Sequence, residues 1–358
     1  MDDYKNAGVD IKAGDRASKI AYEYAKSTFS SRKGMIGEPV IDEGSYAGLI
    51  DMGEFYLVQC DDGVGTKIEI AERIGKYNTL GYDLLAMVAD DAVCLGAETI
   101  SISNTIDTNK IDAKVIEGLM KGLAKACIEQ KVIIPGGEIA EVGKSVNGNI
   151  WNATAVGILE KDKLITGSDI KPEDKVIALK EKGFRSNGFS LIRYIIEKEF
   201  GKDVYLKESP FGKTWGEMLL EPSKIYSAEL LKILGRFGEK RKVEIKGISH
   251  ITGGGIAKNF KRIIKNKKVG TDIHDLFEPS EMVKEIQKIG NVTEQEAYKT
   301  WNMGNGMMLV VAPSDVDSVL DNINIEAKIV GEITENDFIE IQTKGIDPQI
   351  LRYSMEHR

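Results

Sequence analysis

The segment FYLVQCDDGVGTKIEIAERIG, residues 55–75, changes from a strand pattern to a helix pattern through a short turn that contains two glycines. Residues 55–60 are mostly aromatic and β-branched, as in a strand, and residues 66–75 have helical spacing. Gly63 and Gly65 allow backbone amides to approach an anion, and the N-terminus of the following helix attracts negative charge. The segment therefore predicts an α/β fold with a phosphate site where the strand meets the helix.

The charged residues of this turn indicate which ligand it binds. Lys67 supplies a cation, whereas the bare carboxylates of Asp61 and Asp62 would repel a phosphate unless a metal ion lies between them. The spacing matches neither a Walker A loop nor a dinucleotide-binding GxGxxG motif. An ordinary strand-to-helix turn with solvated aspartates is the alternative. We predict phosphate contacts from Gly63, Gly65, Thr66 and Lys67, a metal ligand in Asp62, and catalytic roles for Asp62 and Lys67.

Residues 81–98, GYDLLAMVADDAVCLGAE, predict a helix with a carboxylate on its apolar face. At 100° per residue, Leu84 and Val88 fall within a narrow stripe and Asp91 falls in its middle, while Asp90 lies to one side. A charge buried in this way must be paired, hydrogen-bonded or metal-bound. We therefore predict that Asp91 is a metal ligand, with an ion pair to a lysine or arginine elsewhere in the chain as the alternative.

A third acidic segment is VIIPGGEIAE, residues 132–141, where a predicted buried strand ends in two glycines. We expect Gly136 and Gly137 to bind phosphate and the following Glu138 to bind metal, although a tight turn with a surface glutamate is the alternative. Mg²⁺ uses one or two carboxylates together with phosphate oxygens. The predicted Mg²⁺ ligands are Asp62, Asp91 and Glu138.

Two glycine-containing turns in the second half of the chain each lead into a helix. They are FRSNGFSLIR, residues 184–193, and SHITGGGIAKNF, residues 249–260. Both patterns predict helix starts that bind anions, although Ser186 or Asn187 could equally be an ordinary N-cap. His250 is either a catalytic residue, which we predict, or a structural histidine. The anion-binding candidates are Arg185, Ser186, Asn187, Gly188, Thr252, Gly253 and Gly254.

The composition excludes several classes of protein. With 42% hydrophobic and 29% charged residues, the chain of 358 residues resembles a globular protein long enough for two domains. The net charge of -8 leaves no basic footprint for nucleic acid or an anionic membrane surface. The opening MDDYKNAGVDI has no signal-peptide pattern, so we expect a cytoplasmic protein. Cys60, Cys94 and Cys127 lack metal or disulfide spacing and are expected to be reduced and buried.

The order of the predicted elements is typical of an α/β fold, with parallel or mixed sheets both possible. Strand patterns occur at 55–60, 132–135, 151–159, 175–179, 307–312 and 338–342. Helix patterns occur at 15–28, 66–75, 82–96, 112–129, 189–199, 217–236, 280–289 and 314–322. Turn residues in 164–176 suggest a boundary near 170, which gives a first domain at 1–169, a second at 170–345 and a frayed tail at 346–358.

Eight motifs taken together resemble one enzyme family in their order and spacing, from about residue 4 to residue 342. They are YKNAGVDI (4–11), GSYAG (44–48), DDGVGTK, DLLAMVADD, GGEIAE, SNGFS, HITGGG and NVTEQEAYKTWNMGNGM (291–307). The chain thus resembles the phosphoribosylformylglycinamidine cyclo-ligases. The resemblance implies an N-terminal α/β domain whose sheet pairs with a second subunit to form a barrel. A second α/β domain would cover the site, and ATP would bind at the dimer-associated cleft near Lys5.

The reaction that the resemblance implies is an ATP-dependent ring closure. Formylglycinamidine ribonucleotide becomes aminoimidazole ribonucleotide, and ATP becomes ADP and phosphate. The formyl oxygen is phosphorylated, and the amidine nitrogen of the substrate then closes the ring and displaces phosphate. The implied ligands are ATP, Mg²⁺ and a ribonucleotide held by the turns at 185–188 and 252–254 of a homodimer.

The chain departs from the usual pattern of the resembled family at several residues, among them Ser45, which lies in a loop that usually carries another glycine or a histidine. Asp61 stands where threonine is usual, Asp90 stands where asparagine is usual, and Arg185 replaces a histidine. If the turn at Arg185 only holds anionic oxygens, a guanidinium can serve as well as an imidazole. We therefore predict that Arg185 binds the substrate and transfers no proton.

Related enzymes give alternative functions. Selenophosphate synthetases use an N-terminal Cys or selenocysteine, and hydrogenase-maturation dehydratases end in a reactive Cys, whereas the cysteines here lie between Cys60 and Cys127. Thiamine-monophosphate kinases usually carry GGDT where this chain has GGEI. A kinase of that kind, or a non-catalytic ATP-binding partner protein, remains as the alternative.

Overall fold

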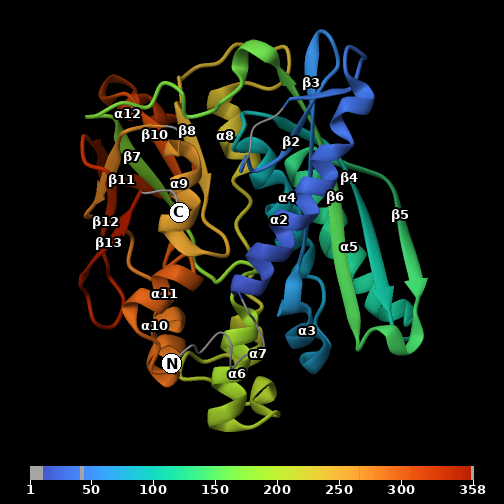
Figure 1. Ribbon diagram of the computed structural model, residues 1–358. Coiled ribbons are helices and arrows are strands. Elements are labelled where there is room, and N and C mark those ends of the chain that lie inside the picture. The colour runs from blue at the N-terminus through green and yellow to red at the C-terminus, as the bar shows by residue number, and fades with distance from the viewer. Residues whose placement is uncertain (1–10, 41–43, 266, 356–358) are drawn as a thin grey trace.

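The computed structural model describes residues 11–40, 44–265 and 267–355, which form two units, each built on a mixed β-sheet (Figure 1). The first sheet has the strand order β1-β2-β3-β6-β4-β5, and the second has the order β13-β12-β9-β11-β7-β10-β8. Helices α4, α8 and α9 lie between the two sheets (Figure 1). This arrangement confirms the predicted mixed α/β, two-domain architecture.

Among the described residues, helices cover one face of the first sheet. Its strands are β1 (Glu38–Val40), β2 (Gly48–Asp51), β3 (Phe55–Gly63), β4 (Glu98–Thr108), β5 (Ile133–Glu141) and β6 (Asn149–Glu160). The accompanying helices are α2 (Ile11–Ser27), α3 (Ile68–Ile74), α4 (Leu80–Val93) and α5 (Ala113–Gln130). Along β6, Trp151, Ala153 and Ala155 are buried against this helical layer, as the two-residue period of a strand requires.

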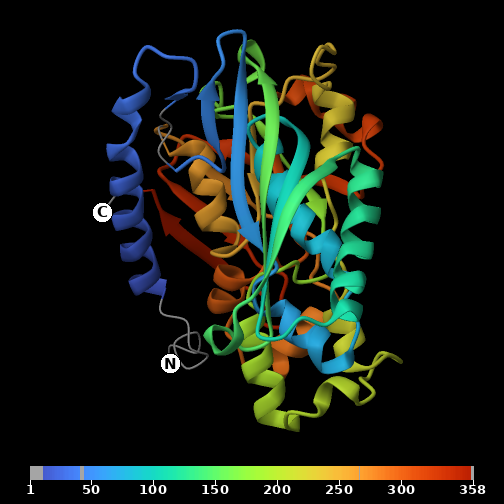
Figure 2. The same ribbon diagram turned by 90° about the vertical axis from the view of Figure 1, so that its right-hand side faces the viewer.

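The opposite face of the first sheet is open in the part of the chain that the structure describes. Figure 2 looks onto this face, with α4 behind the strands. Asn152 and Ser103 are exposed there, and Val156 is only half-buried. A sheet face that mixes apolar and polar side chains in this way can pack against another protein surface.

The second unit contains the second sheet and all the remaining α-helices of the described chain. Its strands are β7 (Lys175–Lys180), β8 (Gly247–His250), β9 (Gly270–Ile273), β10 (Asn305–Val311), β11 (Ala327–Thr334), β12 (Phe338–Gln342) and β13 (Ile350–Ser354). Its helices are α6 (Phe189–Phe200), α7 (Trp215–Leu219), α8 (Ser227–Leu234), α9 (Gly255–Ile264), α10 (Glu281–Ile289), α11 (Glu294–Thr300) and α12 (Val316–Asn322). Every residue of β10 is buried, because this strand lies between β7 and β8 with helices on the sheet.

Short 3₁₀ helices complete the fold. They are η1 (Phe29–Arg32), η2 (Gly65–Lys67), η3 (Gly143–Ser145), η4 (Lys161–Lys163), η5 (Val204–Leu206) and η6 (Pro313–Asp315). Of these, η2 follows directly on β3 and continues into α3, so the predicted strand-to-helix turn is confirmed. Among the described residues, no helix combines the length and the apolar character that crossing a membrane requires.

Several predicted elements differ from the structure. The pattern at 217–236 contains two helices, α7 and α8, because Pro222 cannot continue a helix. The segment predicted as a buried strand ending at Gly136 is an exposed edge strand, β5, that continues to Glu141. The predicted tail contains β13, which pairs with β12. The domain boundary at 169/170 falls in the connection between β6 and β7 and remains a prediction.

Candidate functional site

Three of the predicted glycine-containing turns lie together between the two sheets. A Cβ placed on Gly65 would lie 3.6 Å from the backbone oxygen of Ser186. A Cβ placed on Gly253 would lie 3.5 Å from Nδ2 of Asn187. The end of β3, the turn before α6 and the turn before α9 therefore belong to one site, although they are up to about two hundred residues apart in the chain.

A polar hollow of about 420 Å³ opens at the end of β3, on the uncovered face of the first sheet. Its lining comes from three neighbouring strands: Asp61, Asp62, Gly63, Ser103, Thr105, Asn152, Ala153 and Thr154. Glycine is favoured at position 63, because a Cβ there would lie 2.8 Å from the backbone oxygen of Trp151. The sequence predictions omitted the hydroxyl and amide side chains of β4 and β6, which reach this hollow only through strand pairing.

Two carboxylates near this hollow, Asp62 and Asp91, have raised pKa values. The surrounding protein desolvates Asp62 and raises its pKa to about 6, although one side of Asp62 stays open to solvent and its Oδ1 accepts the Gly63 amide at 2.7 Å. Burial likewise raises the pKa of Asp91 to about 7. The negative charge of Asp91 adds to the shift at Asp62, so the two carboxylates are close enough to repel each other. A cation between them would relieve both effects.

Asp91 also contacts His250, whose ring is completely buried. The Nδ1 atom of His250 lies 2.7 Å from Oδ1 of Asp91. Burial and the neighbouring Arg185 lower the pKa of His250 to about 3, so the imidazole is neutral at physiological pH. Its Nε2 lies 2.8 Å from Nη2 of Arg185. Both ring nitrogens are therefore occupied by protein groups in this structure, which favours the structural alternative for His250 over the predicted catalytic role.

Arg185 lies in a different position from the one that the sequence predicts. Its side chain is completely buried and pairs with Asp90, with 2.7 Å between Nη2 and Oδ2. It also contacts Glu181 at 3.1 Å. A guanidinium that is enclosed in this way cannot reach a substrate, so the expected direct substrate contact of Arg185 is inconsistent with the structure. Two of the departures from the family pattern, Asp90 and Arg185, are thus partners of each other.

Lys67 is also buried, although we expected it at the phosphates. Its Nζ lies 2.8 Å from Oδ1 of Asp83 and 2.7 Å from the carbonyl oxygen of Glu221, and both side chains of the ion pair are fully enclosed. The ammonium additionally faces the ring of Phe189 at 5.4 Å. These contacts give Lys67 a structural role in this conformation, so the predicted phosphate contacts of Gly63, Gly65 and Thr66 remain as candidates without it.

Glu138 is separate from the other two predicted metal ligands. It is exposed on the edge strand β5, in register with Thr105 of β4, Asn152 of β6 and Gly63 of β3. Three strand spacings amount to about 14 Å. Among the described residues, no group of three or more His, Cys, Asp or Glu side chains could hold a metal ion. Gly136 and Gly137 lie on the same edge strand, and Lys5 lies outside the described residues.

The turn before α6 carries buried polar atoms that have no hydrogen-bond partner among the described residues. Gly188 and Gly254, which precede α6 and α9, have left-handed φ values of 75° and 98°. The side-chain oxygens of Ser186 and Asn187 are buried and have no hydrogen-bond partner among the described residues. Buried polar atoms without partners usually contact water or a ligand. This observation supports the predicted binding role of the turn, apart from Arg185.

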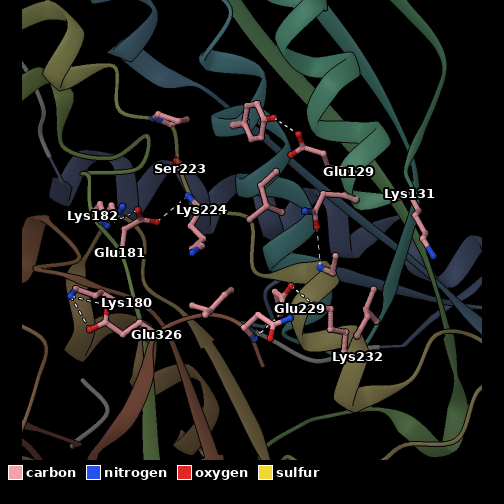
Figure 3. Close-up of a pocket in the computed structure, with 18 of the residues that line it drawn as sticks. Glu129, Lys131, Lys180, Glu181, Lys182, Ser223, Lys224, Glu229, Lys232 and Glu326 are labelled. Atoms are coloured by element: carbon pink, nitrogen blue, oxygen red, sulfur yellow. Dashed lines mark hydrogen bonds and ion pairs between the residues drawn. The ribbon is translucent and has the colours of Figure 1, made fainter. Parts of the chain in front are cut away.

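Residues 221–226, which connect α7 to α8 and are called the connecting strap below, separate the site from a second cavity. The strap carbonyls of Glu221 and Lys224 accept hydrogen bonds from Lys67 and Arg185. The other side of the strap lines an open groove of about 870 Å³, in which Ser223, Lys224 and Glu181 lie side by side (Figure 3). The groove contains similar numbers of acidic and basic side chains. No local sequence pattern indicates this groove, because its lining comes from segments that are far apart in the chain.

Comparison with family models covers most of the chain. Residues 44–159 match the model described as AIR synthase related protein, N-terminal domain. Residues 171–344 match AIR synthase related protein, C-terminal domain.

Curated relatives match over nearly their whole length. The phosphoribosylformylglycinamidine cyclo-ligase of Pyrococcus furiosus is 37% identical over 345 residues, which is 96% of this chain and 98% of that protein. The protein of the same name from Thermococcus kodakarensis is 36% identical over the same shares. The one from Methanocaldococcus jannaschii is 35% identical over 99% of this chain and 98% of its own length.

Solved structures share the fold at low identity. The HypE–HypF complex contains a chain with a TM-score of 0.60 and 17% identity, with coverage of 87% of this chain and 93% of that chain. PurL of Thermotoga maritima, complexed with ADP, has a TM-score of 0.56 and 15% identity, with coverage of 88% of this chain and 46% of that chain.

Proposed function

This chain belongs to the phosphoribosylformylglycinamidine cyclo-ligase family, and from that premise we propose how its own residues carry out the reaction. It is an ATP-dependent ligase of purine biosynthesis that closes the ring of formylglycinamidine ribonucleotide to give aminoimidazole ribonucleotide. The observation that carries the site assignment is the meeting of the turns at Gly65, Ser186 and Gly253 next to the polar hollow. We expect the enzyme to act in the cytoplasm.

The direct test is product formation. The purified chain should convert formylglycinamidine ribonucleotide, with ATP and Mg²⁺, into a product that gives the colour reaction of an aminoimidazole. ATP hydrolysis without that product would indicate a kinase-like relative, and ATP binding without turnover would indicate a non-catalytic partner protein. Both results would contradict the assignment.

We propose that ATP lies at the end of β3 and that the ribonucleotide lies at the helix starts. The backbone at Gly63 and Gly65 and the hydroxyl of Thr66 would hold the phosphates of ATP, because glycine gives anions close access to amides. Ser186, Asn187 and Gly188, together with Thr252, Gly253 and Gly254, would hold the ribonucleotide. Phosphoryl transfer asks mainly for positioning and charge neutralisation, which such groups provide. The predicted role of Gly136 and Gly137 requires a second subunit at the exposed edge of β5.

We further propose that Asp62 and Asp91 hold Mg²⁺. Two desolvated carboxylates that repel each other fit a divalent cation, and both are oxygen ligands of the type that Mg²⁺ prefers. When bound, the ion would neutralise developing charge on the transferred phosphoryl group. Glu138 fits the same ion only if it comes from a second subunit docked on the open sheet face.

Mg²⁺ affinity should depend on pH in a defined direction. Because the pKa values of Asp62 and Asp91 are raised to about 6 and 7, protons compete with Mg²⁺ below neutral pH. Affinity should fall by roughly tenfold or more from pH 8 to pH 6, with proton release on binding. Titration calorimetry in two buffers of different ionisation enthalpy measures the Mg²⁺ affinity and the number of protons released. An affinity that is flat over this range would contradict the assignment.

The same shifts affect the stability of the metal-free protein. A carboxylate whose pKa is raised on folding binds more protons in the folded state, so its contribution favours folding at low pH. That contribution is lost as the pH rises from about 4 through 6 and 7, the folded values of Asp62 and Asp91. Saturating Mg²⁺ should therefore stabilise the protein more at pH 8 than at pH 6.

We propose that the active form is a homodimer that pairs through the open face of the first sheet. This face exposes Asn152 and Ser103 beside the half-buried, apolar Val156, and the polar hollow opens on it. Light scattering should give twice the monomer mass at micromolar concentration. Val156→Arg should shift the protein to a monomer and reduce activity, whereas Lys175→Met, on the second sheet, should do neither. A wild-type monomer with full activity would defeat this proposal.

A further inference from the structure

We propose that Arg185 is a positioning residue for the reaction. It holds His250 in one neutral tautomer and thereby sets the orientation of the Asp91 carboxylate. The kinetic part of this inference rests on the proposed function, whereas its structural part stands on the contacts of Arg185 alone. Arg185 itself contacts no substrate, so its effect passes through His250.

All four terminal N–H groups of the Arg185 guanidinium have acceptors. Nη1 donates to Oε2 of Glu181 at 3.1 Å and to the carbonyl oxygen of Lys224 at 2.7 Å. Nη2 donates to Oδ2 of Asp90 at 2.7 Å and faces Nε2 of His250 at 2.8 Å. A planar guanidinium with every terminal hydrogen used has one orientation. A lysine, with three N–H groups on one atom, cannot reproduce these four contacts.

This geometry fixes the tautomer of His250. A guanidinium can only donate, so Nε2 of the imidazole must accept, and the ring proton must reside on Nδ1. The Nδ1–H then donates to Oδ1 of Asp91 at 2.7 Å. A hydrogen bond of this kind to a carboxylate that holds a metal ion usually fixes its orientation and changes metal affinity or activity severalfold or more.

The contacts close into a ring that begins and ends on one helix. Asp90 and Asp91 are consecutive on α4, and the chain of contacts runs from Asp90 through Arg185 and His250 back to Asp91. The second oxygen of Asp90 accepts the amides of Tyr226 and Ser227 at 2.9 and 3.0 Å. The ring therefore ties α4 of the first unit to β8 and the connecting strap of the second.

Arg185 also has a backbone conformation that its side-chain role explains. Its φ of 60° lies in the left-handed region, which is unfavourable for a residue with a long side chain. Such a conformation persists only where surrounding contacts enforce it, and it is common at functional sites. The guanidinium also lies 5.2 Å from the centre of the Tyr226 ring. Packing against this ring and the hydrogen bonds of the guanidinium together keep Arg185 in this conformation.

The test compares Arg185→Lys and Asp90→Asn with the wild type. Asn keeps an oxygen for the two amides but removes the charge that orients Arg185. The chain has only three histidines, so ¹⁵N-histidine NMR resolves His250. We expect a pure Nδ1–H tautomer in the wild type and a mixture in both variants. Turnover should fall about 10- to 100-fold, while the Michaelis constant for the ribonucleotide stays within about twofold.

Arg236→Lys is the matched control, because Arg236 also forms an ion pair between the two units, with Glu98, away from the site. It should leave the tautomer and turnover unchanged. A pure Nδ1–H tautomer in Asp90→Asn or Arg185→Lys would overturn the inference, as would a raised Michaelis constant with unchanged turnover. If Arg185→Lys does not fold, Asp90→Asn alone decides. Wild-type protein that makes no aminoimidazole would refute the proposed function, and the tautomer measurement would still judge the role of Arg185.

Discussion

Asp91→Asn is expected to lower turnover by about 1000-fold and to abolish Mg²⁺-dependent ATP binding. Asp91 is one of two desolvated carboxylates that we assign to the metal ion, and a metal ion contributes several kcal/mol to phosphoryl transfer. A loss of about 4 kcal/mol corresponds to a factor of about 1000 in rate. Asparagine keeps the size of the side chain and an acceptor for His250, so the fold should survive.

Asp90→Asn is the neighbouring variant that makes this result specific. Asp90 is fully buried and pairs with Arg185, so it cannot touch the metal ion. In titration calorimetry, we expect Asp90→Asn to keep Mg²⁺-dependent ATP binding within a few fold of the wild type. Turnover should still fall, because Arg185 loses the charge that orients it. The reverse pattern, with binding lost in Asp90→Asn and kept in Asp91→Asn, would refute the assignment of Asp91.

Lys67→Met is expected to reduce the free energy of unfolding by about 3–5 kcal/mol, because it leaves the carboxylate of Asp83 buried without its cation. Both members of this pair are completely enclosed, and the Lys67 ammonium also bonds to the strap carbonyl of Glu221. Denaturant unfolding followed by circular dichroism measures the change. The sequence alone predicted a phosphate contact for Lys67, which would instead raise the Michaelis constant for ATP.

The double variant Lys67→Met with Asp83→Asn separates these two roles. Removing both charges should recover much of the lost stability, since the amide oxygen of the introduced asparagine would still accept the hydrogen bonds that Ser223 gives to Asp83. A stable Lys67→Met protein with a strongly raised Michaelis constant for ATP would show that the ammonium moves to the phosphates in the working enzyme. The structural role proposed for Lys67 would then be wrong.

Local patterns in the sequence predicted the elements that carry the site. The segment at 55–75 shows both the end of a strand and the start of a helix, and the structure confirms β3, η2 and α3 there. Strand β4 was not predicted, because its sequence, ETISISNTIDT, is rich in serine, threonine and asparagine. A typical strand has larger apolar residues at every second position. Two of these polar side chains, Ser103 and Thr105, line the hollow, so the feature that obscured the strand is part of the site.

Partners that are distant in the chain could not be predicted. The helical phase of α4 placed Asp91 on the apolar face and Asp90 to one side, whereas Asp90 is the completely buried residue. Helical phase identifies the buried residues only of a helix with one apolar face, but α4 is packed between the first sheet, α5 and α8, so nearly all of its surface is enclosed. Arg185, the partner of Asp90, is 95 residues away, and nothing in its local sequence indicates burial.

The connecting strap has a consequence for how the chain folds during synthesis. The carboxylates of Asp83 and Asp90 accept hydrogen bonds from backbone amides of the strap and of the first residue of α8. These donors lie 136 to 140 positions later in the chain. When the first sheet leaves the ribosome, these carboxylates have no such partners, and burying them then would be costly. The first unit should therefore stay loosely packed around α4, as a folding intermediate, until the strap is made.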